Sequence, residues 1–106
     1  MSTDRELLEL AAKATGRKLH VSQSAMPGVL LDDLTAWAPL EDDGDALRLA
    51  VKLELEILWM LCSRSVVVAD KHRLHQIAEE FPKDDPEQSV RRAIVRAAAA
   101  IGESMP

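Results

Sequence analysis

Residues 1–16 carry apolar side chains at helical spacing. One stripe is formed by Leu7, Leu10, Ala11 and Ala14. Thr3 and Glu6 stand three residues apart, as in a capping box in which the glutamate side chain reaches back to the N–H of the cap. Gly16 follows the last apolar position, where a left-handed C-terminal cap is expected. The pattern therefore predicts a first helix over this segment.

A second helical pattern begins after an acidic turn and covers about residues 43–53. Asp42 or Asp43 is suited to cap it, because a short carboxylate accepts from the free N–H groups of the first turn and complements the helix dipole. The apolar positions at helical spacing are Leu47, Ala50, Val51 and Leu53. Arg48 and Lys52 stand four residues apart and are expected to face solvent.

The last helical pattern opens at Asp85, a capping residue. Pro86 occupies the first helical position and Gln88 the capping-box site. The predicted buried face consists of Val90, Ala93, Ile94, Ala97 and Ile101. The small side chains of residues 97–100 permit close approach to another surface, and Gly102 is expected to end the helix.

Between the first two helices the pattern changes to alternation. Residues 18–22 and 29–31 are predicted as the two strands of a hairpin around the turn-forming segment 22–28. Asp32 and Asp33 would end the second strand. A loop in place of that second strand remains the alternative.

After the second helix, both alternating sets of residues 55–62 are apolar at the centre, which is typical of a strand buried on both faces or lying in the middle of a sheet. A polar break at 63–65 and the β-prone run 66–68 predict a hairpin. Residues 72–81 match a third strand or a short helix. We prefer the strand, because successive strands with short connections are the simplest topology.

This order of elements predicts a single α+β domain over residues 1–106. About three helices would pack as a layered sandwich on an antiparallel sheet of four to five strands. The length suits one domain with its own core, and the apolar fraction of 47% is ordinary for a folded chain.

The charge balance restricts the classes of partner. The formal net charge is −5, which argues against a generic binder of duplex DNA or of anionic membranes. The longest apolar run, residues 57–62, is far too short to span a bilayer, and no cationic leader precedes an apolar segment. We expect a cytoplasmic protein without membrane contact.

Cysteine and histidine suggest no metal or catalytic chemistry. Cys62 is the only cysteine, so an internal disulfide is excluded. We interpret it as a small buried hydrophobe and not as a nucleophile, which would need a base and an oxyanion donor. His72 and His75 would point to opposite faces of a strand, so a metal site with His20 is not favoured. We predict no metal, no cofactor and no enzymatic activity.

The cluster Asp42-Asp43-Gly44-Asp45 invites comparison with a calcium loop. An EF-hand loop spreads its ligands over about twelve residues and ends in a bidentate glutamate, and this spacing is missing. Capping of a helix is the preferred interpretation. Of the two tryptophans, we expect Trp59 in the core and Trp37 packed beneath the start of the second helix, with an exposed binding anchor as the alternative for Trp37.

Three blocks of the chain, residues 4–16, 37–53 and 91–102, resemble a family of small tailed-phage and prophage proteins of unknown function, related to the phage ABA-sandwich domain. The specific block is Trp37-Ala-Pro-Leu-Glu-Asp-Asp-Gly-Asp-Ala-Leu47. Ala38 stands where the family usually has asparagine, so any capping role of that asparagine is lost. The resemblance implies an α/β/α-like sandwich and a place in the cytoplasm of a bacterial host, and it supplies no catalytic residues. Residues 55–86 resemble nothing in the family and are a candidate partner-specific surface.

Phage origin favours a small accessory protein that binds a host macromolecule, such as an inhibitor of a host defence complex of the anti-CRISPR kind. An acidic face could imitate a phosphate backbone and compete for a basic channel. The candidate partner-binding residues are Asp32, Asp33, Asp42, Asp43, Glu79 and Glu80. The simpler interpretation is that these acids are solvated caps and turns that give solubility.

Two alternative functions stay open. A nucleic-acid-binding regulator would use Arg91, Arg92 and Arg96, although such arginines more often complement a helix dipole and the acids of the protein itself. A structural homo-oligomer would associate through the alanine-rich face of the last helix or through an edge strand.

Overall fold

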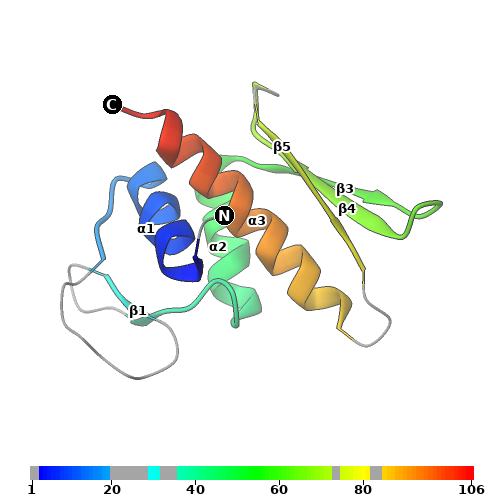
Figure 1. Cartoon of the computed structure of the whole chain (residues 1–106), viewed down its shortest axis with the longest axis horizontal. Helices are drawn as coiled ribbons and strands as arrows, with labels where there is room; N and C mark the ends of the chain where they lie inside the picture. The colour runs from blue at the N-terminus through cyan, green and yellow to red at the C-terminus, as the bar shows by residue number, and fades with distance from the viewer. Residues whose placement is uncertain (1–2, 20–28, 32–35, 73–74, 82–84) are drawn as a thin grey trace.

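The computed structural model describes residues 3–19, 29–31, 36–72, 75–81 and 85–106. Within them lie three helices: α1 (Asp4–Ala14), α2 (Asp43–Leu53) and α3 (Pro86–Ser104). The strands are β1 (Val29–Leu30), β2 (Ala36–Trp37), β3 (Glu56–Met60), β4 (Ser65–Ala69) and β5 (Gln76–Glu80). The chain is therefore α+β as predicted, with three helices and an antiparallel sheet (Figure 1).

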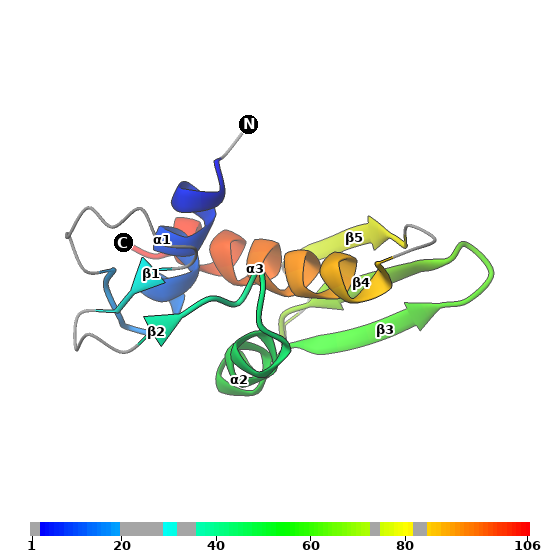
Figure 2. The same cartoon turned by 90° about the horizontal axis from the view of Figure 1, so that it is seen from below.

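The sheet is smaller than predicted. Among the described residues it has three strands in the order β3-β4-β5, and β1 and β2 form a separate short pair. The expected sheet of four to five strands is wrong, because the first hairpin lies apart from the later strands (Figure 2). Leu19 bridges Leu31 in antiparallel fashion, as the hairpin prediction implies, but β1 takes β2 as its ladder partner. The predicted turn at 22–28 lies outside the described residues.

Local hydrogen bonds begin each helix where the sequence predicts. The Thr3 hydroxyl oxygen accepts from the N–H of Glu6 at the start of α1, 3.2 Å away. Asp42 accepts from the N–H of Asp45 at 2.7 Å, so Asp42 and not Asp43 caps α2. Asp85 accepts from the N–H of Gln88 at 3.1 Å, with proline at the first position of α3. Each cap satisfies a donor that would otherwise be unpaired.

The core is built around α3, which contacts α1, α2, β4 and β5 (Figure 1). Ala93, Ile94 and Ala97 are buried as predicted, whereas Val90 and Ile101 are half-buried. Burial extends further around the helix than one stripe. The additional buried residues are Ser89, Val95, Ala98, Ala99 and Gly102.

The helices α1 and α3 pack very close together. Arg92 reaches Asp4 near the start of α1, and the Lys13 ammonium donates to the carbonyl of Met105 at the other end, at 3.1 Å. A Cβ atom on Gly102 would lie 1.9 Å from the carbonyl oxygen of Leu10. The prediction that Gly102 ends the helix is wrong: α3 continues to Ser104, and the glycine permits the backbones to approach.

The predicted apolar face of α2 is also wrong in part. Leu47 and Val51 are 60% and 68% exposed, and the buried positions are Ala46, Leu49 and Ala50. The side of α2 that packs against α3 is the buried side. It is narrower than the predicted face and carries smaller side chains. In α1, Leu7 and Ala11 are buried as expected, and Leu8 and Ala12 join them in place of Leu10 and Ala14, which are half-buried.

In the three-stranded sheet, the central position belongs to β4 and not to the segment 55–62. Val66 and Val68 of β4 are fully buried, whereas β3 is an edge strand that pairs along one side with β4. The preference for a strand in 72–81 is confirmed by β5. The register places Ile57 opposite Val68, and Val68 opposite Ile77, on the face covered by α3 (Figure 2).

Candidate protein-binding surface

The four predicted acidic residues that the structure describes do not form one face. Asp32 and Asp33 lie outside the described residues. Asp42 caps α2, while Asp43 forms an ion pair with Arg91 at 2.6 Å. Glu79 and Glu80 are neighbours on a strand and therefore point to opposite faces of the sheet, with Glu79 toward α3.

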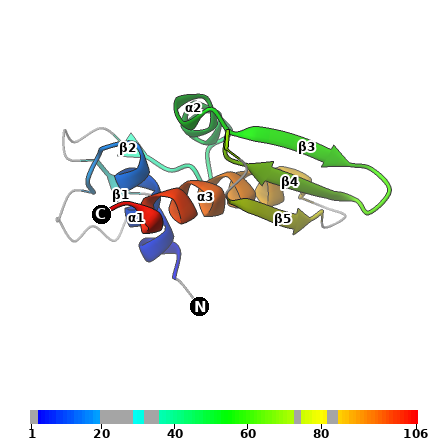
Figure 3. The ribbon, with the colours of Figure 1, turned by 90° about the horizontal axis from the view of Figure 1, so that it is seen from above.

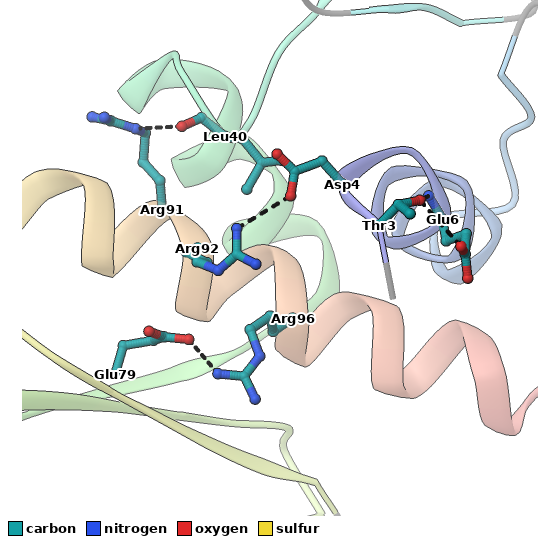
Figure 4. Close-up of polar contacts among 8 residues, drawn as sticks. All are labelled: Thr3, Asp4, Glu6, Leu40, Glu79, Arg91, Arg92 and Arg96. Carbon is teal, nitrogen blue, oxygen red and sulfur yellow. Dashed lines mark hydrogen bonds and ion pairs between the residues drawn. The ribbon is translucent and has the colours of Figure 1, made fainter. Parts of the chain in front are cut away.

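The arginines of α3 are engaged by these and other acids. Arg91 donates to the carbonyl of Leu40 at 2.9 Å as well as to Asp43. Arg92 pairs with Asp4 at 3.3 Å, and Arg96 pairs with Glu79 (Figure 4). The predicted basic face is thus occupied by the protein's own carboxylates, which confirms the simpler interpretation of the arginines. It also leaves the described part of the acidic set mostly paired within the molecule.

The other candidate chemistry is dispersed. Among the residues that the structure describes, no group of three or more His, Cys, Asp or Glu side chains could hold a metal ion. Cys62 is exposed in the turn after β3, so its interpretation as a buried hydrophobe is wrong. The described helices include none that is long and apolar enough to cross a membrane.

The acidic turn serves the local structure of α2. The N–H of Ala38 donates to the Asp45 carboxylate at 2.9 Å, which ties the segment before the helix to its first turn. Arg48 donates to the same carboxylate at 2.7 Å. This hydrogen bond, followed by the charges of Asp45 and Asp42, raises the pKa of Arg48 above its ordinary value. Trp37 is half-buried against the core beside this turn, close to its predicted place.

Two concavities lie near the end of α1. The larger, of about 610 Å³, is lined by both ends of the ion pair between Arg5 and Glu9 and by Lys13, which donates to the carbonyl of Met105. The smaller, of about 370 Å³, includes Asp45 and Arg48, which are paired with each other. Their polar linings are therefore largely engaged within the protein.

The most distinctive surface lies on the hairpin of β3 and β4. Four consecutive large apolar side chains are exposed there: Leu58, Trp59, Met60 and Leu61, at 41%, 57%, 45% and 80%. The expectation that Trp59 lies in the core is wrong. Its ring is 6.1 Å from that of Phe81, centroid to centroid, and the remainder faces solvent because β3 projects along the edge of the sheet.

The register of the strands divides this surface into two faces. Trp59 lies opposite Val66 on the side of α3. On the other side, Leu58 lies opposite Val67, and Val67 opposite Ala78. We define the open face as Leu58, Met60, Val67 and Ala78, whose side chains are exposed or half-buried. Figure 3 shows the three strands β3, β4 and β5 that carry it, beside α3.

Sequence patterning did not identify the open face, because an apolar strand predicts burial. The signal that could have found it is the contrast between the long apolar run at 57–62 and the polar sequence of the third strand, Gln76–Glu80. When one edge strand is apolar and the other is polar, the rest of the fold cannot bury both edge strands to the same extent. Because so many large apolar groups are exposed together on a small protein, the open face is the candidate interaction surface of the described residues.

No family model, curated protein or solved structure matches this chain. The resemblance to phage proteins therefore depends on the three sequence blocks alone, and a function has to be argued from the surface just described.

Proposed function

We propose that the protein is a non-enzymatic phage or prophage accessory protein that binds a host protein through the open face of its sheet. The observation that carries this proposal is the cross-strand row of Leu58, Val67 and Ala78, with Met60 beside it, on the side of the sheet opposite α3. Exposed apolar rows of this kind stabilise a protein complex when a partner removes them from water.

The rim of the open face specifies the chemistry of the partner. Glu80 lies in the same cross-strand row as Met60 and is exposed, and Gln76 borders the other end of β5. The whole chain carries a net charge of −5. A partner with an apolar patch bordered by lysine or arginine complements this arrangement in both shape and charge.

The proposed partner is still a host protein, as expected from the sequence. The residues proposed to contact it are different. Of the acidic candidates in the described segments, Glu80 borders the open face, whereas Asp43 and Glu79 neutralise arginines of α3. We propose an apolar centre with an acidic rim in place of a continuous imitation of a phosphate backbone. Inhibition of a host defence complex is the sharpest form of the proposal, and phage origin supports it by analogy.

The test is recovery of a host protein from bacterial lysate by tagged wild-type protein and by two variants. Leu58→Asp combined with Met60→Asp places charges on the open face. Leu47→Asp is the matched control, because Leu47 is a similarly exposed leucine on α2. A specific partner should be lost with the double variant and kept with the control.

The recovered partner is then purified and its affinity is measured directly by calorimetry. Burial of a large apolar side chain contributes about 1.5–3 kcal/mol when complete, so two charged replacements should weaken binding by at least about a hundredfold. Circular dichroism confirms that each variant is folded. Equal affinity of the double variant and the control would contradict the proposal.

A further inference from the structure

The larger concavity beside α1 shares no residue with the open face. It is bounded by one side of α1, by the segment that follows this helix, and by Met105 and Pro106. Figure 3 shows α1 and the C-terminus at the end of the molecule opposite the β3–β4 hairpin. A ligand in this concavity and a protein on the open face would therefore not compete for the same side chains.

The lining of this concavity is positively charged, in contrast to the whole chain. Four cationic side chains and one carboxylate line it, whereas the chain has 13 Lys and Arg against 18 Asp and Glu. The cations are Arg5, Lys13, Arg17 and Lys18, and the carboxylate belongs to Glu9. A concave surface lined mainly by one sign of charge concentrates ions of the opposite sign. The concavity is therefore suited to an anion.

The bonds made within the concavity leave part of this charge without a counter-charge. Glu9 pairs with Arg5 at 3.1 Å, which engages the one acidic side chain of the lining. Lys13 donates to the carbonyl of Met105, a neutral acceptor, and an ammonium group has three donors in all. In the described segments no carboxylate pairs with Lys13 or with Lys18. These two lysines can therefore still donate to an added anionic group.

The concavity also offers apolar contact. Leu19 is half-buried and Met105 is 37% exposed, and both line it together with Pro106. The volume of about 610 Å³ lies within the range of roughly 300–1,000 Å³ that is typical of small-molecule pockets. Such pockets combine apolar walls with a few polar groups that orient the ligand. Size and lining thus favour an organic anion over an inorganic ion.

We propose that this concavity binds a small amphipathic anion. The carboxylate or phosphate group of the ligand meets Lys13 and Lys18. Its apolar body contacts Leu19 and Met105. Both parts are needed, because salt screens the attraction of an exposed lysine, and apolar contact alone would not distinguish this site from the open face. The proposal is independent of host-protein binding.

The first test uses three ligands with the same apolar chain. Octanoate and octyl phosphate carry the two head groups, and neutral 1-octanol is the matched control. Each is titrated into the isotopically labelled whole chain while backbone amide resonances are followed. Residues 13, 16–19 and 105 should shift with at least one anion. The alcohol should bind at least about tenfold more weakly, because one hydrogen bond between charged groups contributes roughly that factor.

The second test removes the charge of the two lysines. Lys13→Gln combined with Lys18→Gln keeps a donor at each position and should raise the dissociation constant of the anion at least about tenfold. Arg64→Gln combined with Lys71→Gln removes the same charge from exposed residues outside the concavity and should leave the dissociation constant unchanged. Circular dichroism confirms that both double variants are folded.

Resonance shifts that appear only on the open face, or in no residue, would overturn the site. Equal affinity for the alcohol and the anions would overturn the role of charge, as would equal losses of affinity in the two double variants. The head group that binds more tightly identifies the class of ligand. None of these results bears on the host protein, whose recovery is tested by the variants at Leu58 and Met60.

Discussion

Gly102 decides how closely two helices of the core can approach. The carbonyl oxygen of Leu10 in α1 occupies the space where a side chain on this residue would begin. The α1–α3 contact continues with alanines, which are buried at positions 97, 98 and 99. The close approach of α1 and α3 thus depends on the absence of a side chain at Gly102.

We expect Gly102→Ala to lower the free energy of unfolding by about 2–3 kcal/mol, because the clash is with backbone that cannot rotate away. Chemical denaturation monitored by circular dichroism measures the change. Gly44→Ala is the matched control within another helix. There the new methyl group meets the side-chain ends of Asp42 and Arg48 at 3.1–3.3 Å and no backbone atom, so a shift of a few tenths of an ångström relieves the contact and the free energy of unfolding should change by less than about 1 kcal/mol. Similar losses in both variants would contradict this account of the helix contact.

At the scale of elements, β3 is exposed and β4 is buried. The size of their apolar side chains alone suggests the opposite. β3 holds the largest apolar side chains, yet β4 lies between two strands and beneath α3. Burial depends on the number of neighbours that an element has, and a central strand has more of them than an edge strand. The smaller valines of β4 therefore carry more of the core than the tryptophan of β3.

Val66→Ala is expected to cost about 2 kcal/mol of folding free energy, since it removes two fully buried methyl groups. Trp59→Ala should cost less than about 1 kcal/mol in the single chain, despite the larger volume removed. Chemical denaturation monitored by circular dichroism compares the two. A larger loss for Trp59→Ala would show that β3 belongs to the core after all.

For the whole molecule, the two faces of the sheet differ: one packs against α3 and the other is open. α3 covers one face, where Arg96 and Glu79 form an ion pair, and the open face and the β3 edge remain toward solvent (Figure 2). The three arginines of α3 pair with carboxylates of the protein itself. In the described residues, the exposed surface that sets this sheet apart is therefore apolar and not charged.

Amide hydrogen exchange should reveal this asymmetry residue by residue. The N–H groups of Val66 to Val68 are expected to exchange slowly at any concentration, because β4 is paired on both sides. Outward N–H groups of β3 should exchange at least about tenfold faster than those of Val66 to Val68, because no described strand lies along that side of β3. Nuclear magnetic resonance measures both sets. Equal exchange rates in the two strands would contradict this asymmetry.

The sequence by itself determined the features that depend on a few neighbouring residues. Thr3, Asp42 and Asp85 begin their helices because each cap accepts from an N–H three residues away. The segment 65–69 pairs with 56–60, since alternation and a short polar turn are local signals. Residues 72–81 matched both a strand and a short helix, and pairing with β4 decided for the strand. The α+β class followed from this order of elements.

Only the tertiary structure decided which surfaces are covered. Leu47 and Trp59 belong to strongly apolar segments, yet both are exposed because α3 packs on other positions. Gly102 looked like the end of a helix and serves instead as a contact with Leu10, ninety-two positions earlier in the chain. Such outcomes depend on which distant elements become neighbours. The open face belongs to this second group, because it consists of apolar residues that the core leaves uncovered.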